Sequence, residues 1–267
     1  MKETRLTTYA SLEAGQLIGP ERHRFKLISA GPSQPPGQLW LAEDLSTQDP
    51  VSVSLLIFDP AQFPEDDQIA RLRDTLNRTR ILKFQRLLPI FGQFAFRGLL
   101  FIATPKLDGL SLAQLIEQKK LDLLSIKQRS GLAVQLGKAL HAVQMGRMSH
   151  GTLCPELIYL NRGQGAVLLG TGWYNALDPD TSQLSYAKYQ LESDLNRGKA
   201  STLGDTFALG MLIVEIFNNG KLQIESPPAD LTVEQWERLR PLLTEPDSSD
   251  IKTPLQLVRE LFGEAPS

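Results

Sequence analysis

His150-Gly-Thr-Leu-Cys-Pro-Glu-Leu157 is the stretch of this 267-residue chain that decides the fold. It follows a long amphipathic run, Ile126–Gly146, in which apolar residues recur at the spacing of one helix face. It precedes two short apolar runs separated by Asn161–Gly165, a pattern typical of a β-hairpin. The sequence therefore predicts a loop between a long helix and a hairpin.

The first hundred residues predict mainly strands, and most of the remainder predicts helices. Alternating or apolar runs indicate strands at Arg24–Ser29, Gln38–Asp44, Val51–Ile57, Ile90–Ala95 and Leu99–Thr104. One helix is expected among them, at Asp66–Phe84. Helical spacing then marks Leu112–Glu117, Ile126–Gly146, Leu203–Phe217, Val233–Leu243 and Pro254–Leu261. Strands followed by helices indicate the α+β class.

The motifs, in their order, resemble those of bacterial serine/threonine protein kinases. The loop keeps the His, Leu, Pro and Glu of the kinase catalytic loop, which reads His-Arg-Asp-Leu-Lys-Pro-Glu-Asn. Trp40-Leu-Ala-Glu-Asp44 is similar to the end of the second kinase strand, and Asp205-Thr-Phe-Ala-Leu-Gly210 to the start of a buried helix. The resemblance covers roughly Leu17 to Phe262.

This resemblance implies a bilobal protein-kinase-like fold with a small β-rich N-lobe and a mainly helical C-lobe. The expected division is an N-terminal extension at 1–16, the N-lobe at 17–105, the C-lobe at 106–262 and a frayed tail at 263–267. Pro105–Gly109 resembles the hinge that joins the lobes.

Four positions lack the residue that the kinase family uses for phosphoryl transfer. Thr152 replaces the Asp that accepts the proton of the substrate hydroxyl, and Leu157 replaces the Asn that holds Mg²⁺. Ser54 replaces the Lys that contacts the phosphates, and Gly170 replaces the metal-binding Asp. The resemblance therefore implies a degenerate kinase, or pseudokinase, with no catalytic residue and no cofactor or metal.

Other kinase elements are altered as well. The loop Gly31–Gly37 contains three prolines, which lack the backbone N–H that a phosphate-cradling loop needs. The helix expected at Asp66–Phe84 has Asp74 near its centre, where the family has a glutamate that pairs with the lysine. Lys188 and Tyr189 stand where the family has a Pro-Glu pair that helps to hold substrate peptides.

Three residues in or near the loop in the expected fold are interpreted as structural. His150 has no nearby nucleophile to activate, and the resemblance implies that it packs beneath the loop. The resemblance also implies that Asp205 accepts backbone N–H bonds from the loop, since a buried carboxylate needs such donors. Cys154 is the only cysteine, so no intrachain disulfide can form, and we interpret its side chain as packing.

Charge and hydropathy narrow the classes of partner. The formal net charge of −2 provides no general basic field, so we expect no nucleic-acid partner. No run of about 18 apolar residues predicts a membrane span, and the first residues lack the apolar core of a secretory signal. The sequence therefore predicts a cytoplasmic protein.

The hypothesis that the sequence favours is a catalytically inactive kinase-like domain that acts as a regulatory or scaffolding module by binding protein. The expected partner surface comprises the loop Gly31–Gly37 and the arginines of the expected helix, which are Arg71, Arg73, Arg78 and Arg80.

Two alternatives remain open, so the sequence leaves undecided whether the chain is an enzyme. A divergent enzyme could reuse the kinase cleft; its candidate residues are Thr171, Cys154, Asp108 and Glu156, which form no recognisable catalytic set. A non-catalytic small-molecule or nucleotide sensor could use a cleft lined in part by Leu39 and Ala103.

Overall fold

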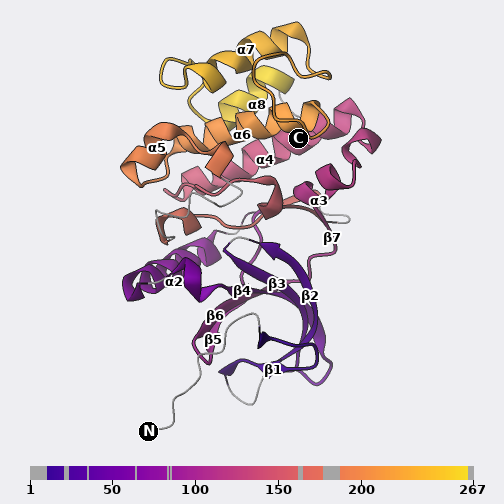
Figure 1. The fold of residues 1–267 in the computed structure, drawn as a ribbon, viewed down its shortest axis with the longest axis vertical. Coiled ribbons are helices and arrows are strands. Elements are labelled where there is room, and N and C mark those ends of the chain that lie inside the picture. Colours follow the sequence, from indigo (N-terminus) through magenta and orange to yellow (C-terminus); the bar gives the residue numbers. More distant parts are fainter. Residues whose placement is uncertain are drawn as a thin grey trace. The chain divides into compact units, whose positions relative to one another are not determined.

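The chain divides into two compact units in a computed structural model (Figure 1). The structure describes residues 11–20, 24–34, 36–63, 65–82, 84, 86–161, 165–176 and 187–263. Among these, the first unit contains the residues up to Ile81 together with Leu88–Asp108 and Ala176. The second unit contains the described residues of Leu82–Leu87 and Gly109–Asn175, and those from Ala187 onward. Each unit is described separately below.

The first unit is built on an antiparallel sheet whose strands lie in the order β1-β2-β3-β4-β6-β5. The strands are β1 (Leu17–Ile18), β2 (Phe25–Gln34), β3 (Gly37–Asp44), β4 (Val51–Phe58), β5 (Gly92–Phe96) and β6 (Leu99–Pro105). Alternate residues of these strands form one apolar core, in which the rings of Phe25, Phe94 and Phe101 lie with centroids 5.0–5.8 Å apart. The curled sheet is visible in the lower half of Figure 1.

Part of the segment predicted as the loop Gly31–Gly37 is a strand. Residues 31–34 belong to strand β2, which continues past a register shift between Ala30 and Ser33. Gly37 then begins β3 so close to β4 that a Cβ on it would lie 2.1 Å from the carbonyl oxygen of Ile57. Only glycine fits there. Pro35 and the side chains of 32–34 lie outside the described residues.

Helix α2 (Asp66–Ile81) covers part of this unit and ends before Phe84, where the sequence predicted its end. Its buried positions include Leu72, Leu76 and Thr79 at helical spacing. Strands β5 and β6 are joined by Arg97-Gly98, both with positive φ (47° and 87°), as a tight two-residue hairpin requires.

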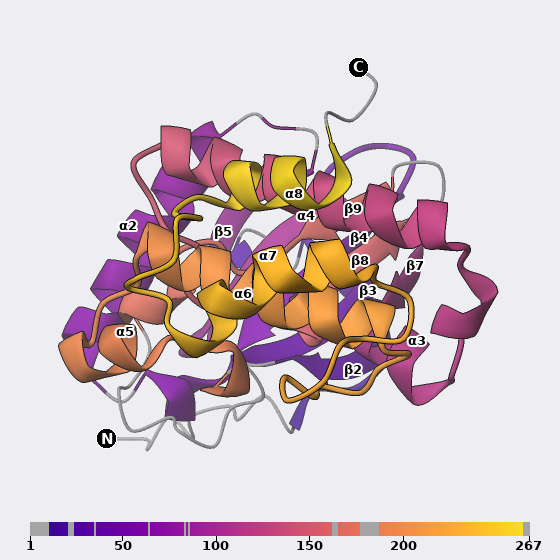
Figure 2. The same cartoon turned by 90° about the horizontal axis from the view of Figure 1, so that it is seen from above.

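The second unit is mainly helical. Its elements are β7 (Gly109–Ser111), α3 (Leu112–Glu117), α4 (Ile126–Met145), β8 (Ile158–Asn161), β9 (Gly165–Leu168), α5 (Glu192–Arg197), α6 (Thr202–Phe217), α7 (Val233–Thr244) and α8 (Pro254–Phe262). Helices α4, α6, α7 and α8 pack together (Figures 1 and 2), and β7, β8 and β9 form a small antiparallel sheet. Side-chain caps at Ser125, Ser201 and Thr232 fix the starts of α4, α6 and α7.

The predicted α+β class is confirmed, with β1, β7 and α5 as additions that the sequence did not predict. The division of the chain at 105/106 stays a prediction. Within the described residues, no helix is long and apolar enough to cross a membrane.

Candidate functional site

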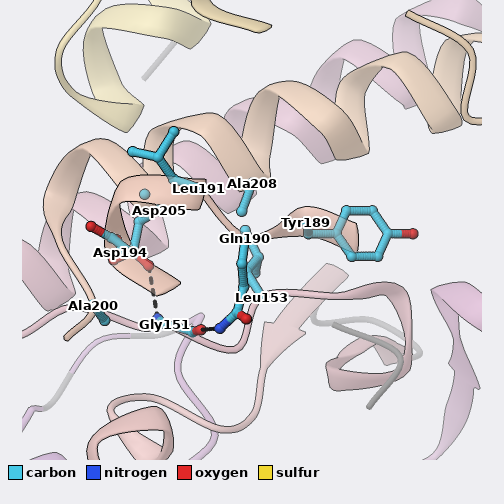
Figure 3. Close-up of a pocket in the computed structure, with 10 residues that line it drawn as sticks. Gly151, Leu153, Tyr189, Gln190, Leu191, Asp194, Ala200, Asp205 and Ala208 are labelled. Atoms are coloured by element: carbon cyan, nitrogen blue, oxygen red, sulfur yellow. Dashed lines mark hydrogen bonds between the residues drawn. The ribbon is translucent and has the colours of Figure 1, made fainter. Parts of the chain in front are cut away.

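The loop that begins at His150 is held by one carboxylate of helix α6. Asp205 lies in the first turn of this helix, where Oδ2 accepts the N–H of His150 at 2.7 Å and Oδ1 accepts the N–H of Gly151 at 2.8 Å. Figure 3 shows Asp205 beside Gly151. Burial raises the pKa of Asp205 to about 7, while the two backbone N–H bonds act to lower it. The predicted role of Asp205 as an acceptor for the loop agrees with this geometry.

His150 joins the loop to the strand end that follows it. Its ring is fully buried, and Nε2 lies 2.7 Å from the carbonyl oxygen of Leu169. The N–H of Gly172 donates to the carbonyl of His150 at 3.0 Å. Burial lowers the pKa of His150 to about 4, so the ring is neutral near pH 7. The ring therefore serves as an internal tie.

Three of the four positions that differ from the kinase pattern in the sequence pack against one another. Thr152 is 1% exposed, and its hydroxyl donates to the carbonyl of Gly170 at 3.1 Å. Gly170 has φ +88°, and a Cβ built on it would lie 2.8 Å from Cδ1 of Leu157, 3.1 Å from Oγ1 of Thr152 and 3.3 Å from Cε3 of Trp173. Leu157 and Trp173 are buried. A side chain at position 170 would thus have a strained backbone, and Leu157 would have to shift to admit it.

Ser54, in the first unit, has a structural use as well. It lies on β4 opposite Thr104 of β6 and is 3% exposed. Its hydroxyl accepts the N–H of Leu107 at 3.0 Å, and its carbonyl accepts the hydroxyl of Thr104 at 3.1 Å. Ser54 thereby fixes the start of the segment that leaves β6.

The residues named for a divergent enzyme do not form an accessible set. Cys154 is fully buried, and its pKa is raised well above the ordinary value, first by burial and then by the nearby Glu156 carboxylate. Thr171 is 2% exposed, whereas Asp108 lies on the surface of the first unit. Among the described residues, no group of three or more His, Cys, Asp or Glu side chains could hold a metal ion.

The two residues proposed to line a small-molecule cleft are both buried. Ala103 belongs to the apolar core of the sheet, opposite Leu55, and Leu39 is 8% exposed on β3. The cavity drawn in Figure 3, in the second unit beside Asp205, has a volume of about 10 Å³. That is room for about one water molecule.

The residues Lys188 and Tyr189, which stand at the Pro-Glu position of the kinase pattern, contact a carboxylate that the sequence analysis did not predict. The buried hydroxyl of Tyr189 donates to Oε2 of Glu215 on α6, and Nζ of Lys188 lies 3.7 Å from Oε1 of the same carboxylate. Burial raises the pKa of Glu215. The signal was in the sequence, since Glu215 interrupts the apolar run of α6 and a buried carboxylate needs donors. Residues 177–186, which precede Lys188 and Tyr189, lie outside the described residues.

The predicted partner surface is described in part. Arg71, Arg73, Arg78 and Arg80 are all exposed on α2. Arg71 pairs with Asp67 at 3.1 Å on the same helix. The described backbone of the loop at 31–34 is a strand, as reported above.

Comparison with known proteins gives a clear answer for the fold. No protein-family model and no curated protein sequence matches the chain. The solved kinase domain of PknI from Mycobacterium tuberculosis, in a singly substituted form, matches with a TM-score of 0.75 and 18% identity over 94% of this chain and 98% of that one. A PknI kinase domain without substitutions gives 0.73 and 17% over the same shares. The chain has the bilobal protein-kinase fold. The expected fold class is confirmed.

Proposed function

We propose that this chain is a kinase-fold protein that does not transfer phosphate and acts by binding another protein. The observation that carries the proposal is the packing of Thr152, Leu157 and Gly170 around a single hydrogen bond. Each of these positions contributes a methyl group, a hydroxyl or a backbone carbonyl to a filled interior.

The residues present do not fit a magnesium ion. Mg²⁺ in phosphate-transfer sites is held by one or two carboxylates together with the phosphates. Thr152 is the one side chain among these three positions with an oxygen, and that oxygen is a neutral hydroxyl rather than a carboxylate. A carboxylate at position 170 would have a strained backbone and would require Leu157 to shift, so this position disfavours it.

The phosphate-contacting position supports the same proposal. A nucleotide triphosphate needs a cation to offset its charge in a protein interior. Ser54 offers a neutral hydroxyl that already accepts the N–H of Leu107. No step of phosphoryl transfer can therefore be assigned to this residue.

The test is nucleotide binding measured by thermal shift, with ATP at about 1 mM and with or without Mg²⁺. A site with a Kd of about 10 µM would stabilise the protein by about 2.7 kcal/mol at that concentration. We expect no Mg²⁺-dependent change in Tm, and no transfer of radiolabelled phosphate to casein. An active kinase domain measured alongside shows that the reagents work. A Mg²⁺-dependent shift, or transfer above the level of heat-denatured protein, would overturn the proposal.

For protein binding, the proposed surface comprises the exposed arginines of α2 together with the loop Gly31–Gly37. Guanidinium groups form the strongest hydrogen bonds with carboxylates and phosphates, and these weaken as salt screens them. The partner should therefore be acidic, and its recovery should fall with rising salt concentration.

A further inference from the structure

Two buried carboxylates of the second unit line the same small cavity. Asp194 of α5 is 5% exposed, and Asp205 of α6 is 4% exposed. The cavity has a volume of about 10 Å³, and Gln190 and Gly151 also line it (Figure 3). It has room for about one water molecule, and the two carboxylates, the amide and the backbone give such a water the polar partners that it needs.

The two carboxylates differ in how their charge is compensated. Oδ2 of Asp194 accepts the backbone N–H and the hydroxyl of Ser201, both at 2.8 Å, and its Oδ1 accepts an N–H of the Arg197 guanidinium at 2.9 Å. Asp205 accepts two backbone N–H groups of the loop. Within the part of the chain that the structure describes, no Lys or Arg forms an ion pair with Asp205.

The other titratable side chains around Asp205 supply no positive charge to it. His150, from the loop, is neutral near pH 7 because burial lowers its pKa to about 4. In the segment before α5, the hydroxyl of Tyr189 and the ammonium of Lys188 both contact Glu215 instead. A proton is therefore the positive charge that these surroundings leave for Asp205.

The balance of these effects places the titration of Asp205 near neutral pH. Burial raises the pKa of Asp205 to about 7, the two N–H bonds act to lower it, and the charge of Asp194 adds a smaller upward effect. The carboxylate can thus change its charge while ordinary carboxylates remain ionised.

The geometry determines which contact responds to the proton. Oδ1 of Asp205 accepts the N–H of Gly151, which lines the cavity, whereas His150 on Oδ2 does not line it. A protonated carboxyl oxygen becomes a donor, so its bond from the N–H of Gly151 is weakened. Gly151 has φ +78° and no Cβ to hinder its rotation. Its carbonyl accepts the amide of Gln190 at 3.2 Å, so a movement here reaches the segment before α5.

We propose that Asp205, Asp194 and the cavity form a proton-dependent latch on the loop that begins at His150. With Asp205 ionised, both N–H bonds hold the loop to α6. When Oδ1 takes a proton from solvent, its new O–H donates to a water molecule in the cavity. The same water accepts the released N–H of Gly151 and donates to Asp194, so every group stays paired while the loop is loosened at Gly151. The latch does not depend on the proposed loss of phosphate transfer.

The test is a pH titration of the full chain by nuclear magnetic resonance, from about pH 5.5 to 8.5, a range in which ordinary carboxylates stay ionised. It follows the side-chain carboxyl carbon of Asp205, assigned by its disappearance in Asp205→Asn, and the backbone amide of Gly151. We expect both signals to change with one shared midpoint close to pH 7. Below the midpoint, the Gly151 amide should be less protected from hydrogen exchange.

Three variants locate the titrating group. Asp194→Asn removes the neighbouring negative charge and should move the midpoint lower by at least about 0.5 pH unit. Asp230→Asn is the matched control, because it makes the same change at a carboxylate that pairs with Arg129 and does not line the cavity. Its midpoint should equal that of the unchanged chain. In Asp205→Asn the amide of Gly151 should no longer titrate; if this variant does not fold, the comparison of the other two still decides.

The latch would be refuted by a carboxyl carbon of Asp205 that does not titrate in this range, or by a Gly151 amide that does not follow it. An unchanged midpoint in Asp194→Asn, or an equal shift in Asp230→Asn, would refute it as well. The nucleotide assay is independent of these results. A chain that transfers phosphate while Asp205 titrates as expected refutes the proposed inactivity alone.

Discussion

Replacing Gly170 by alanine tests whether the space beside this residue is filled. With φ at +88°, any L side chain there adopts a left-handed conformation, which costs about 1–2 kcal/mol. The new Cβ would also lie 2.8 Å from Cδ1 of Leu157 and 3.1 Å from Oγ1 of Thr152. Overpacking of this kind costs about 1–3 kcal/mol. We therefore expect a loss of about 2–5 kcal/mol in the free energy of unfolding.

Two other glycines provide matched controls for the backbone cost. Gly15 has φ +84°, and Gly198 has φ +59°, but neither would place a Cβ within 4 Å of another residue's atoms. Alanine at each should cost only the backbone part, about 1–2 kcal/mol. Urea unfolding followed by tryptophan fluorescence and circular dichroism measures all three variants. The excess loss in Gly170→Ala over the controls reports the filled space.

An equal loss in Gly170→Ala and the controls would show that space exists beside Leu157. That result would refute the packing argument and reopen the metal position. The stronger form of the test is Gly170→Asp, which restores the carboxylate of the kinase family. If the space is filled, this variant loses stability, since it also buries a charge beside apolar side chains. It should gain no Mg²⁺-dependent nucleotide binding.

Three further outcomes are expected from the described contacts. Burial lowers the pKa of His150 to about 4, whereas an unfolded histidine has a pKa of about 6.5. Below pH 6.5 the unfolded chain therefore binds a proton that the folded chain does not bind. The free energy of unfolding should fall by about 2 kcal/mol by pH 5. His150→Gln should lack this loss. Because Asp205 titrates in both proteins, the difference between their stability-versus-pH curves isolates the imidazole. Parallel curves for the two proteins would refute the burial argument. Arg129→Met should destabilise by about 3–5 kcal/mol, because Arg129 donates to three backbone carbonyls and, at 2.6 Å, to Asp230; Asp230→Asn should cost less, and the reverse order in denaturant unfolding would contradict this. Ser54→Lys should lower Tm without producing an ATP-dependent shift, whereas a shift would show that the lysine is what the chain lacked.

Much of the fold could be predicted because its strands and helices carry local signals. The apolar alternation of Val51–Ile57 and the helical spacing of Ile126–Gly146 both predicted elements that the structure contains as β4 and α4. Elements stabilised by distant partners gave no such signal. β1 has only Leu17 and Ile18, and its pairing with β2 depends on a neighbour that the chain supplies later. Residues 31–34 continue β2 despite a proline because β3 returns alongside them.

The candidate site could be located from the sequence, but its packing could not. The motif order located Thr152, Leu157 and Gly170, and the structure shows how these three residues pack. The apolar run around Glu215 signals that this carboxylate needs a donor, but Tyr189 lies 26 residues away, so no local pattern identifies it as that donor.

The polar groups of this interior share one property, which is that each is paired with a backbone group. Asp205 accepts two backbone N–H groups, and the Thr152 hydroxyl donates to a carbonyl. Each would leave a buried group unpaired if it were removed, at a cost of about 1–3 kcal/mol. A carboxylate at position 170 would have the opposite effect, because without a metal it would be an uncompensated charge beside Leu157 and Trp173. Under the proposed function, in which no metal binds, stability alone favours Asp205 and favours a glycine at position 170.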